Sequence, residues 1–327
     1  MFRKITLIAL AAFTAACNQG YEFDFPEQSN NFPSNVIYNN KVDVVFVVDN
    51  SSMMDQANES WRNSLPTLVN AMLKQKLDLH IAVITTSMGG SNPNGGRFMG
   101  SPRYLTSQTP NLANALVQRV AAVGNDGSDL ERGLDSLAQV LGNGYQNGEG
   151  QGFLRDDALL SIIAMSTEDD KSSNLSGGLT GFSNFLDGLK GFYDDGSRRW
   201  NLSFVGILSL TGSCSTLPDI GYNEPGVRWM NLAAMSQGLT ASICSGDLSS
   251  AAATIRARIA QIITDFYLSK KPDLDTLVVL VNGVSVPRSN VDGWDYDPVR
   301  NVVRFYGSAI PSADSAIRID FKPAEAN

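Results

Sequence analysis

The sequence predicts an α/β protein with a mainly parallel central sheet and helices on both faces, followed by a small C-terminal all-β module. Two observations predict the sheet: near-continuous apolar runs recur along the chain, and segments with apolar residues at helical spacing separate them. A third predicts the module, because from residue 272 onward strand-like segments follow one another without intervening helices.

The first part of the chain alternates between strand and helix patterns. Pro66 lies inside the first helical pattern, where it should break or kink the helix. The leucine and isoleucine stripes on these helices are interpreted as core. The expected strands cover residues 42–48, 79–85, 159–165, 202–208 and 239–244, and the expected helices cover residues 54–76, 111–120, 129–141, 182–189 and 248–266.

The C-terminal module, residues 272–322, is expected to contain strands at 276–281, 284–286, 302–306 and 316–321. Asn282-Gly283 between two apolar runs predicts a tight hairpin, since both turn residues must tolerate positive φ. The connection at 293–298 carries Trp294 and Tyr296. These aromatic side chains would either complete the small core of the module or form a binding face.

The most informative junction follows the first strand, where an apolar run breaks into Asp49-Asn50-Ser51. Ligands of open α/β sheets bind at the carboxyl ends of the strands, so Asp49 and Ser51 form a candidate site for a hard cation or an anion. The alternative is that these residues only cap the following helix.

This junction resembles the first loop of the metal-ion-dependent adhesion site of von Willebrand factor A domains, which reads Asp-x-Ser-x-Ser. Asp49 and Ser51 match, whereas Met53 stands where the second serine is expected and its thioether is a poor ligand for Mg²⁺ or Ca²⁺. Residues 152–158 resemble the approach to a central strand in secreted bacterial A domains. The resemblance covers roughly residues 41–268, and the module resembles the one that trails such bacterial lipoproteins.

Two further loops would complete the cation site that the resemblance implies. Ser128 stands where the family has a threonine, and its alternative role, shared with Asp129, is to cap a helix. The third loop reads Ser-Thr-Glu-Asp-Asp, with Thr167 at the position of the family aspartate. Glu168 or Asp169 would then reach the site through a shift of the loop, and Asp169 is taken as the candidate ligand. The alternative is a solvated acidic edge.

The predicted ligands of Mg²⁺ or another divalent cation are therefore Asp49, Ser51, Ser128 and Asp169. Because two expected ligand positions are changed, a weak, water-rich site or no site at all is expected.

Composition and motifs narrow the function classes. A net charge of −8 argues against nucleic acid as a partner. The single histidine, His80, lies in an apolar strand, and no zinc-protease, nucleophile-elbow or phosphate-loop motif occurs. The chain is therefore predicted not to be an enzyme, although a carboxylate-based glycosidase needs only two acidic residues.

The N-terminus predicts export. Residues 1–16 combine a short basic start with an apolar stretch too short to span a bilayer. The ending Thr-Ala-Ala-Cys resembles a bacterial lipobox, which implies lipidation of Cys17, and Asn18 favours the outer membrane by the enterobacterial rule that this resemblance brings. The alternative is an ordinary cleavage site. Residues 17–40 lack periodicity and are predicted to form a tether.

Assigning Cys17 to lipid leaves Cys214 and Cys244, which are predicted to form a disulfide in the oxidising envelope. It would close a loop of about 30 residues, worth roughly 3 to 4 kcal/mol in the chain-entropy model. Two free buried thiols are the alternative.

The combined prediction is a lipid-anchored protein of the bacterial cell envelope, held at the outer membrane, that binds a protein or glycan ligand through the loop edge of an A-type domain. Its contact with the membrane would be through the lipid alone. The alternative is a metal-free structural scaffold or assembly component whose partners dock elsewhere.

Overall fold

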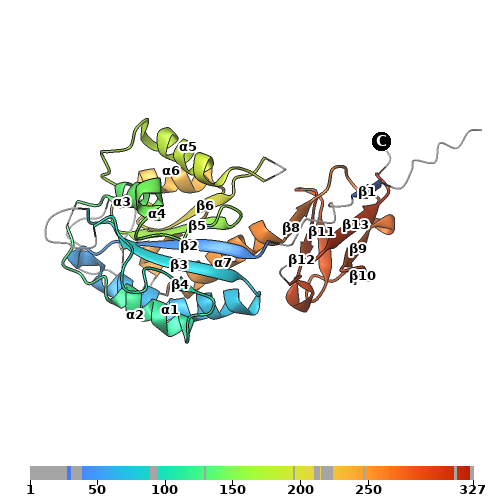
Figure 1. The fold of residues 1–327 in the computed structure, drawn as a ribbon, viewed down its shortest axis with the longest axis horizontal. Helices are drawn as coiled ribbons and strands as arrows, with labels where there is room; N and C mark the ends of the chain where they lie inside the picture. Colours follow the sequence, from blue (N-terminus) through green and yellow to red (C-terminus); the bar gives the residue numbers. More distant parts are fainter. Residues whose placement is uncertain are drawn as a thin grey trace, which may run out of the picture.

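The computed structural model describes residues 28–30, 39–88, 95–128, 130–193, 196–209, 214, 224–245, 247–312 and 315–324. Cys17, with its predicted lipid, and the whole signal segment lie outside the described residues, as does Asp129. Within the described ranges the chain forms a large α/β domain and a smaller all-β module (Figure 1).

The α/β domain is built on a six-stranded sheet with the order β4-β3-β2-β5-β6-β7. The strands β2, β3, β5, β6 and β7 run parallel, and the short edge strand β4 is antiparallel to β3. This arrangement confirms the predicted mainly parallel sheet. The strands are β2 (Lys41–Val48), β3 (Asp78–Thr85), β4 (Leu105–Thr106), β5 (Leu159–Ser166), β6 (Trp200–Gly206) and β7 (Thr240–Ser242).

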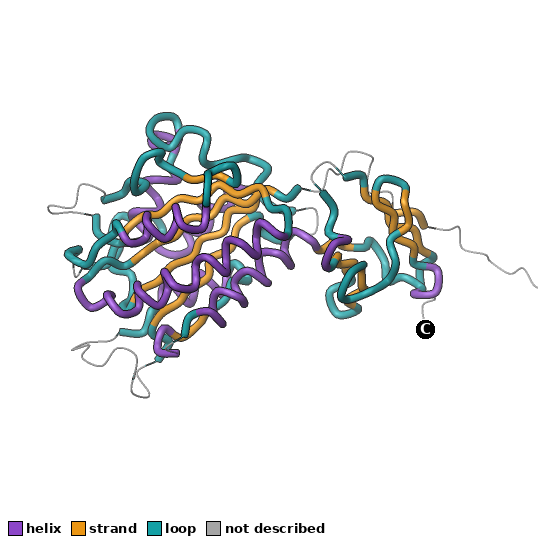
Figure 2. Tube along the Cα trace, turned by 90° about the horizontal axis from the view of Figure 1, so that it is seen from below, coloured by secondary structure: helices purple, strands orange, loops and turns teal. Residues whose placement is uncertain are grey.

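Helices cover both faces of this sheet (Figures 1 and 2). Side chains of β2 alternate between the two resulting cores: Val44 and Phe46 belong to one, and Val45 and Val47 to the other. The first core is closed by α1 (Asp55–Lys74), α2 (Leu112–Ala121) and α7 (Ser249–Thr264), and the second by α3 (Gly133–Leu141), α4 (Asn143–Gln146), α5 (Gly178–Lys190) and α6 (Val227–Met235).

Pro66 does not break α1, which runs without interruption for 20 residues. A proline inside a helix costs about 3 kcal/mol through its missing N–H and its ring clash. Its neighbours Trp61, Leu65 and Leu68 are at most 1% exposed, and burying each such side chain contributes about 1.5 to 3 kcal/mol. Tertiary packing therefore outweighs the local penalty.

Two helices of the second core differ from the sequence prediction. α3 begins at Gly133 rather than at residue 129, because the backbone before it is bonded to other loops: Gly127 N donates to Asn50 O and Arg132 N to Thr86 O, both at 2.8 Å. α6 was not predicted at all, although it buries Trp229 and Leu232 against β6.

The C-terminal module contains two small antiparallel sheets, ordered β1-β13-β9-β10 and β11-β12-β8. The Asn282-Gly283 hairpin is confirmed, with φ of 52° and 80° at its two turn residues. Trp294 and Tyr296 are 4% and 8% exposed, so they belong to the module core. The strands are β1 (Gln28–Asn30), β8 (Asp265–Tyr267), β9 (Val278–Val281), β10 (Val284–Ser285), β11 (Trp294–Asp297), β12 (Val302–Phe305) and β13 (Ile317–Phe321).

Both boundaries of the module differ from the expected ones. Its first C-terminal strand, β8, begins at Asp265 rather than after residue 272 and pairs with β12. Part of the predicted tether also belongs to it, because Gln28–Asn30 pair antiparallel with β13. Backbone pairing along a sheet edge needs no side-chain periodicity, which is why the sequence pattern did not show this strand.

Short 3₁₀ turns complete the fold at Ser52–Met54, Ile243–Ser245, Leu274–Thr276 and Gly307–Ala309. Among the residues that the structure describes, no helix has the length and apolar character needed to cross a membrane.

Candidate functional site

The order of the strands defines where a ligand would bind. Successive strands are added on one side of β2 up to β4, and then on the other side from β5 to β7. The chain therefore reverses direction across the sheet between β2 and β5, and such a switch point leaves a crevice at the carboxyl ends of the two strands. Asp49 directly follows β2, and Ser166 is the last residue of β5.

Asp49 and Ser166 meet across this switch point. The Asp49 amide donates to Met165 O at 3.0 Å, which extends the strand pairing by one residue, and the Ser166 hydroxyl donates to Asp49 Oδ2 at 2.7 Å. The Ser51 amide donates to Asp49 Oδ1 at 2.9 Å. Both carboxylate oxygens thus accept hydrogen bonds from neutral groups within the protein.

Asp49 is 0% exposed, and this burial has the largest effect on the pKa of its carboxyl group. It raises the pKa of this carboxyl group above its ordinary value, and the hydrogen bonds from Ser51 and Ser166 only partly oppose the increase. Ser51 is itself buried, and its carbonyl accepts from the Met54 amide. Asp49 therefore serves as a structural link between two strands as well as a candidate ligand.

Ser128 reaches the same edge through a chain of hydrogen bonds. The Ser87 hydroxyl, just after β3, donates to Asn50 Oδ1 at 2.8 Å, and the Ser128 amide donates to Ser87 Oγ at 2.9 Å. Gly127 fits closely here, since a Cβ at this position would lie 2.5 Å from the Asn50 side chain. These contacts join the loops after β2 and β3 to the loop before α3.

Ser128 does not cap α3, because the helix starts five residues later. Its hydroxyl instead accepts from the Leu130 amide at 3.0 Å. The α3 N-terminus is bonded by Asp170, whose Oδ2 accepts from the Leu134 amide at 3.0 Å. Capping by a residue of a distant loop could not be recognised from the local sequence.

Asp169 lies at the same edge but its carboxylate is directed at α6. Asp169 Oδ1 accepts from the Arg228 amide, in the first turn of that helix, at 2.8 Å. Burial raises the pKa of Asp169, and the Arg228 hydrogen bond opposes this increase. A carboxylate at a helix N-terminus also interacts favourably with the helix dipole.

Asp170 is buried, so a solvated acidic edge does not describe the whole of this loop. The residue is 2% exposed, and its Oδ1 lies 3.2 Å from an Arg228 guanidinium nitrogen. Ser172 donates to it through both its amide and its hydroxyl, each at 3.0 Å. Asp169 and Asp170 together fix the N-termini of α6 and α3 beside the switch point.

The structure brings the predicted cation ligands together only in part. Of the two predicted carboxylates, Asp169 is engaged with α6, which leaves Asp49 among hydroxyl groups and the buried Thr167. Within the described ranges, no group of three or more His, Cys, Asp or Glu residues is placed to hold a metal ion. The side chain of Met53 lies outside what the structure describes. Hard cations favour several oxygen ligands with carboxylates among them.

The disulfide predicted between Cys214 and Cys244 is present, with the two Cα atoms 4.8 Å apart. It joins the loop after β6 to the 3₁₀ turn that follows β7.

The only histidine, His80, lies near the start of β3, at the amino edge. Its Nδ1 is 2.9 Å from Phe153 O, and its ring packs against Tyr104 with centroids 5.0 Å apart.

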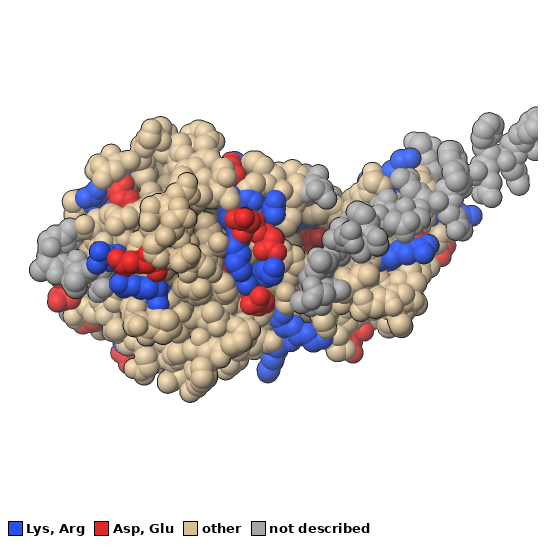
Figure 3. All heavy atoms as spheres, in the orientation of Figure 1, with Lys and Arg blue, Asp and Glu red and all other residues tan. Residues whose placement is uncertain are grey.

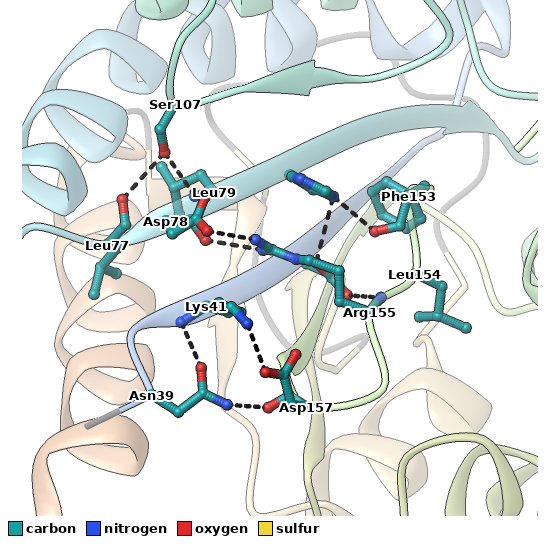
Figure 4. Close-up of polar contacts among 12 residues, drawn as sticks. Asn39, Lys41, Leu77, Asp78, Leu79, Ser107, Phe153, Leu154, Arg155 and Asp157 are labelled. Atoms are coloured by element: carbon teal, nitrogen blue, oxygen red, sulfur yellow. Dashed lines mark hydrogen bonds and ion pairs between the residues drawn. The ribbon is translucent and has the colours of Figure 1, made fainter. Parts of the chain in front are cut away.

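A buried ionic cluster at this amino edge was missed by sequence reasoning. Asp43 on β2 is 0% exposed and accepts from the Arg155 amide at 2.7 Å and from Arg155 Nε at 2.8 Å. Arg155 also pairs with Asp78 at 2.8 Å (Figure 4). Lys190 Nζ lies 3.8 Å from Asp43. The sequence did contain an indication of this cluster, because Asp43 is the one charged residue inside the apolar run 42–48.

The exposed side of the amino edge carries further ion pairs. Lys41 and Asp157 pair at 2.6 Å (Figure 4), and Figure 3 shows a band of mixed acidic and basic side chains between the α/β domain and the module. Exposed pairs of this kind contribute at most about 1 kcal/mol each. These exposed pairs therefore add little to stability, and they lie at the edge opposite Asp49.

Comparisons with known proteins identify no family. No family model matches the sequence, and no curated protein matches it.

Among solved structures, the chain is similar to proximal thread matrix protein 1 from the mussel byssus. Two structures of that protein align with TM-scores of 0.45 and 0.42 at 12% and 13% identity, covering 71% of this chain and 50% of theirs. One of the two has a zinc-occupied MIDAS motif. The pilus adhesin SpaC from Lactobacillus rhamnosus GG aligns with a TM-score of 0.39 at 14% identity, covering 86% of this chain and 38% of that one. This chain thus spans half or less of the length of these proteins, and at these scores the similarity carries no inference about ligand or activity.

Proposed function

We propose that this protein is a lipid-anchored interaction module of the bacterial cell envelope that binds a protein or glycan ligand through the carboxyl edge of its main sheet. The observation that carries the proposal is the network joining the loops at the switch point. Asp49 bonds to Ser166, and Asn50, Ser87 and Ser128 form a connected chain. Loops held in this way form a preorganised surface, which lowers the entropy cost of binding.

Two exposed apolar side chains border this edge. Leu130, between Ser128 and α3, is 53% exposed, and Val227, the first residue of α6, is 49% exposed. The two helix N-termini are adjacent, since a Cβ on Gly133 would lie 2.7 Å from the Trp229 ring. The edge thus offers a partner apolar contact area beside the half-exposed Ser128, while the other hydroxyl groups of the network are buried and hold the loops in place.

The location of the protein rests on the signal segment and Cys17 and is supported by the disulfide between Cys214 and Cys244, which suits an oxidising compartment. The N-terminal strand β1 lies in the module, at the end of the molecule opposite the carboxyl edge (Figure 1). An anchor on Cys17 would therefore leave the binding edge directed away from the outer membrane.

We propose that this binding needs no resident cation and involves no catalysis. In the domains that this chain resembles, a cation is held by several loops. Here Asp169 stabilises α6 and a threonine occupies the position of the family aspartate. The competing proposal is a metal-free scaffold whose partners dock away from this edge.

A capture experiment distinguishes these proposals. The purified chain is used as bait for envelope extracts, alongside Leu130→Ser, Val227→Ser and the control Met235→Ser, which lies at the other end of α6 and is 38% exposed. The expected result is a captured protein or glycan that is lost with both edge variants, retained with the control and unaffected by a chelator. Capture that survives both edge variants supports the scaffold, and capture lost on chelation supports the cation-dependent mode.

A further inference from the structure

A cavity lies far from the carboxyl edge, between α7 and the C-terminal module. It has a volume of about 430 Å³, within the range of small-molecule sites. One wall is α7 and the other is the end of β12 with the turn after it, and Gln75 at the end of α1 lines it as well. In Figure 1, α7 leads directly into β8, which places this cavity where the two parts of the protein join.

The cavity is positively charged although the protein is acidic. Arg256, Arg258 and Arg304 line it, and none of the lining residues is Asp or Glu. The chain as a whole has a net charge of −8. Burial, together with repulsion from the nearby Arg300, lowers the pKa of Arg258, as expected where cations gather. A concave site lined by positive charge raises the local concentration of anions, even on a protein whose net charge is negative.

Two of these arginines are already held by the protein. Arg304 binds Asp265 at 2.5 Å and 3.1 Å, and Arg258 donates to Gln237 O at 2.8 Å and to Gln261 Oε1 at 2.9 Å. These contacts fix two guanidinium groups in the wall. They also use the carboxylate of Asp265, which Arg300 shares.

Arg256 is different, because no residue in the described part of the chain forms a hydrogen bond or ion pair with it. It is half-buried in the middle of α7 and lines the cavity. A guanidinium group offers a planar fork of donors that matches a carboxylate or a phosphate. Arg256 is therefore the group available to bind an anion.

The rest of the lining indicates what else the ligand carries. Gln75 Oε1 is buried and lacks a hydrogen-bond partner among the described residues, so it requires an N–H or O–H donor. Leu239, Phe305 and Ile310 supply apolar surface. A small inorganic ion would lack the apolar body that these three side chains favour.

We propose that this cavity binds a small organic anion whose carboxylate or phosphate group pairs with Arg256 and whose apolar body contacts Phe305 and Ile310. A hydroxyl or amino group on the ligand would donate to Gln75 Oε1. Because α7 and the module form opposite walls, the bound ligand also links the two parts of the protein.

Calorimetric titration of the purified chain with benzoate, phenyl phosphate and the neutral benzamide tests the charge requirement. We expect at least one of the two anions to bind at least tenfold more tightly than benzamide, and the tighter of the two identifies the head group. Binding of benzamide equal to that of both anions would overturn the proposal, as would no binding of either anion at millimolar concentration.

The role of Arg256 is tested with three variants. Arg256→Gln should weaken anion binding about tenfold, the loss typical of a charge-assisted hydrogen bond, and Arg256→Lys should restore part of it. Arg62→Gln is the matched control, a half-buried helical arginine of α1 outside the cavity. Unchanged affinity in Arg256→Gln, or an equal loss in Arg62→Gln, would place the anion elsewhere.

Discussion

At the scale of single residues, the chemistry of the candidate site depends on Asp49. Its carboxylate accepts from the Ser51 amide and the Ser166 hydroxyl, both neutral, and burial raises its pKa. Hydrogen bonds to neutral donors only partly offset the loss of hydration of a buried charge. Asp49 in its ionised form therefore costs folding free energy.

Asp49→Asn is expected to stabilise the protein at neutral pH by about 1 to 3 kcal/mol in a chelating buffer, because a neutral amide replaces a poorly compensated charge. The pKa of Asp49 is higher in the folded protein than its ordinary value of 3.8, so protonated Asp49 adds to the free energy of unfolding. This contribution is complete below pH 3.8 and is lost as the pH rises through the pKa of the folded state. The advantage of the variant should therefore grow as pH rises above about 4. Urea unfolding at several pH values measures it, and a variant that is less stable at every pH would contradict the argument.

Asp43 differs from Asp49, because its buried carboxylate is paired with a cation, Arg155. Arg155→Ala leaves Asp43 without its closest cation and should lower the free energy of unfolding by about 3 to 5 kcal/mol. Arg62→Ala, on α1, is the control and should change it by about 0.5 kcal/mol or less. Chemical denaturation compares the two, and equal effects would show that the Asp43 cluster adds nothing specific.

At the scale of elements, the edge is shaped by the close approach of α3 and α6. A Cβ on Gly133, the first residue of α3, would lie 2.7 Å from Trp229 and 3.0 Å from Val47. Asp169 and Asp170 hold the same two helix ends from the loop after β5. Glycine is therefore required at Gly133 by packing.

Gly133→Ala should destabilise the protein by about 1 to 3 kcal/mol, the usual cost of overpacking a core. Gly144→Ala in α4 is the control, because a Cβ there meets no atom within 4 Å, and it should be neutral or stabilise by up to about 1 kcal/mol. Thermal unfolding of both variants measures the difference. Equal stability would mean that the two helices are not in contact at this point.

The elements that the sequence predicted are those with a strong apolar pattern. The runs at 42–48 and 159–165 correspond to β2 and β5, within one residue at each end. α6 escaped prediction and α3 begins later than expected, because distant loops, not local caps, define their first turns. β1 escaped because backbone pairing alone defines it.

The candidate site was predictable in place but not in geometry. Asp49, Ser51 and Ser128 lie on loops that hydrogen bonds connect at the carboxyl edge, as their positions after and before regular elements indicated. The direction of the Asp169 carboxylate depends on α6, which is nearly 60 residues further along the chain. Side-chain orientation of that kind requires the tertiary fold.

At the scale of the whole molecule, the module lies at the amino edge of the main sheet and the candidate site at the carboxyl edge (Figure 1). Lys76, after α1, reaches Ser312 of the module at 3.3 Å. β1 adds a strand to the module. Along the chain, this strand in the module comes before β2 of the α/β domain. If the proposed function holds, the module would act as a spacer between the anchor and the binding edge.

Removing residues 1–30 should expose the outer edge of β13 while leaving the α/β domain folded. We expect faster amide hydrogen exchange in β13, which loses one of its two neighbouring strands, and unchanged exchange in β2. Mass-spectrometric exchange measures both strands in one experiment. Unchanged protection of β13 would show that β1 does not pair with it in solution.

The proposed ligand binding at the carboxyl edge requires no resident cation. The most direct measurement is thermal unfolding of the wild-type chain and of Met53→Ser with Thr167→Asp, in chelator and in millimolar Mg²⁺, Mn²⁺ or Ca²⁺. We predict no stabilisation of the wild type, whereas the double variant, with a second carboxylate near buried Asp49, should be less stable in chelator and recover with metal. A wild type that gains about 2.7 kcal/mol, as expected at 100 times a dissociation constant, would contradict the claim.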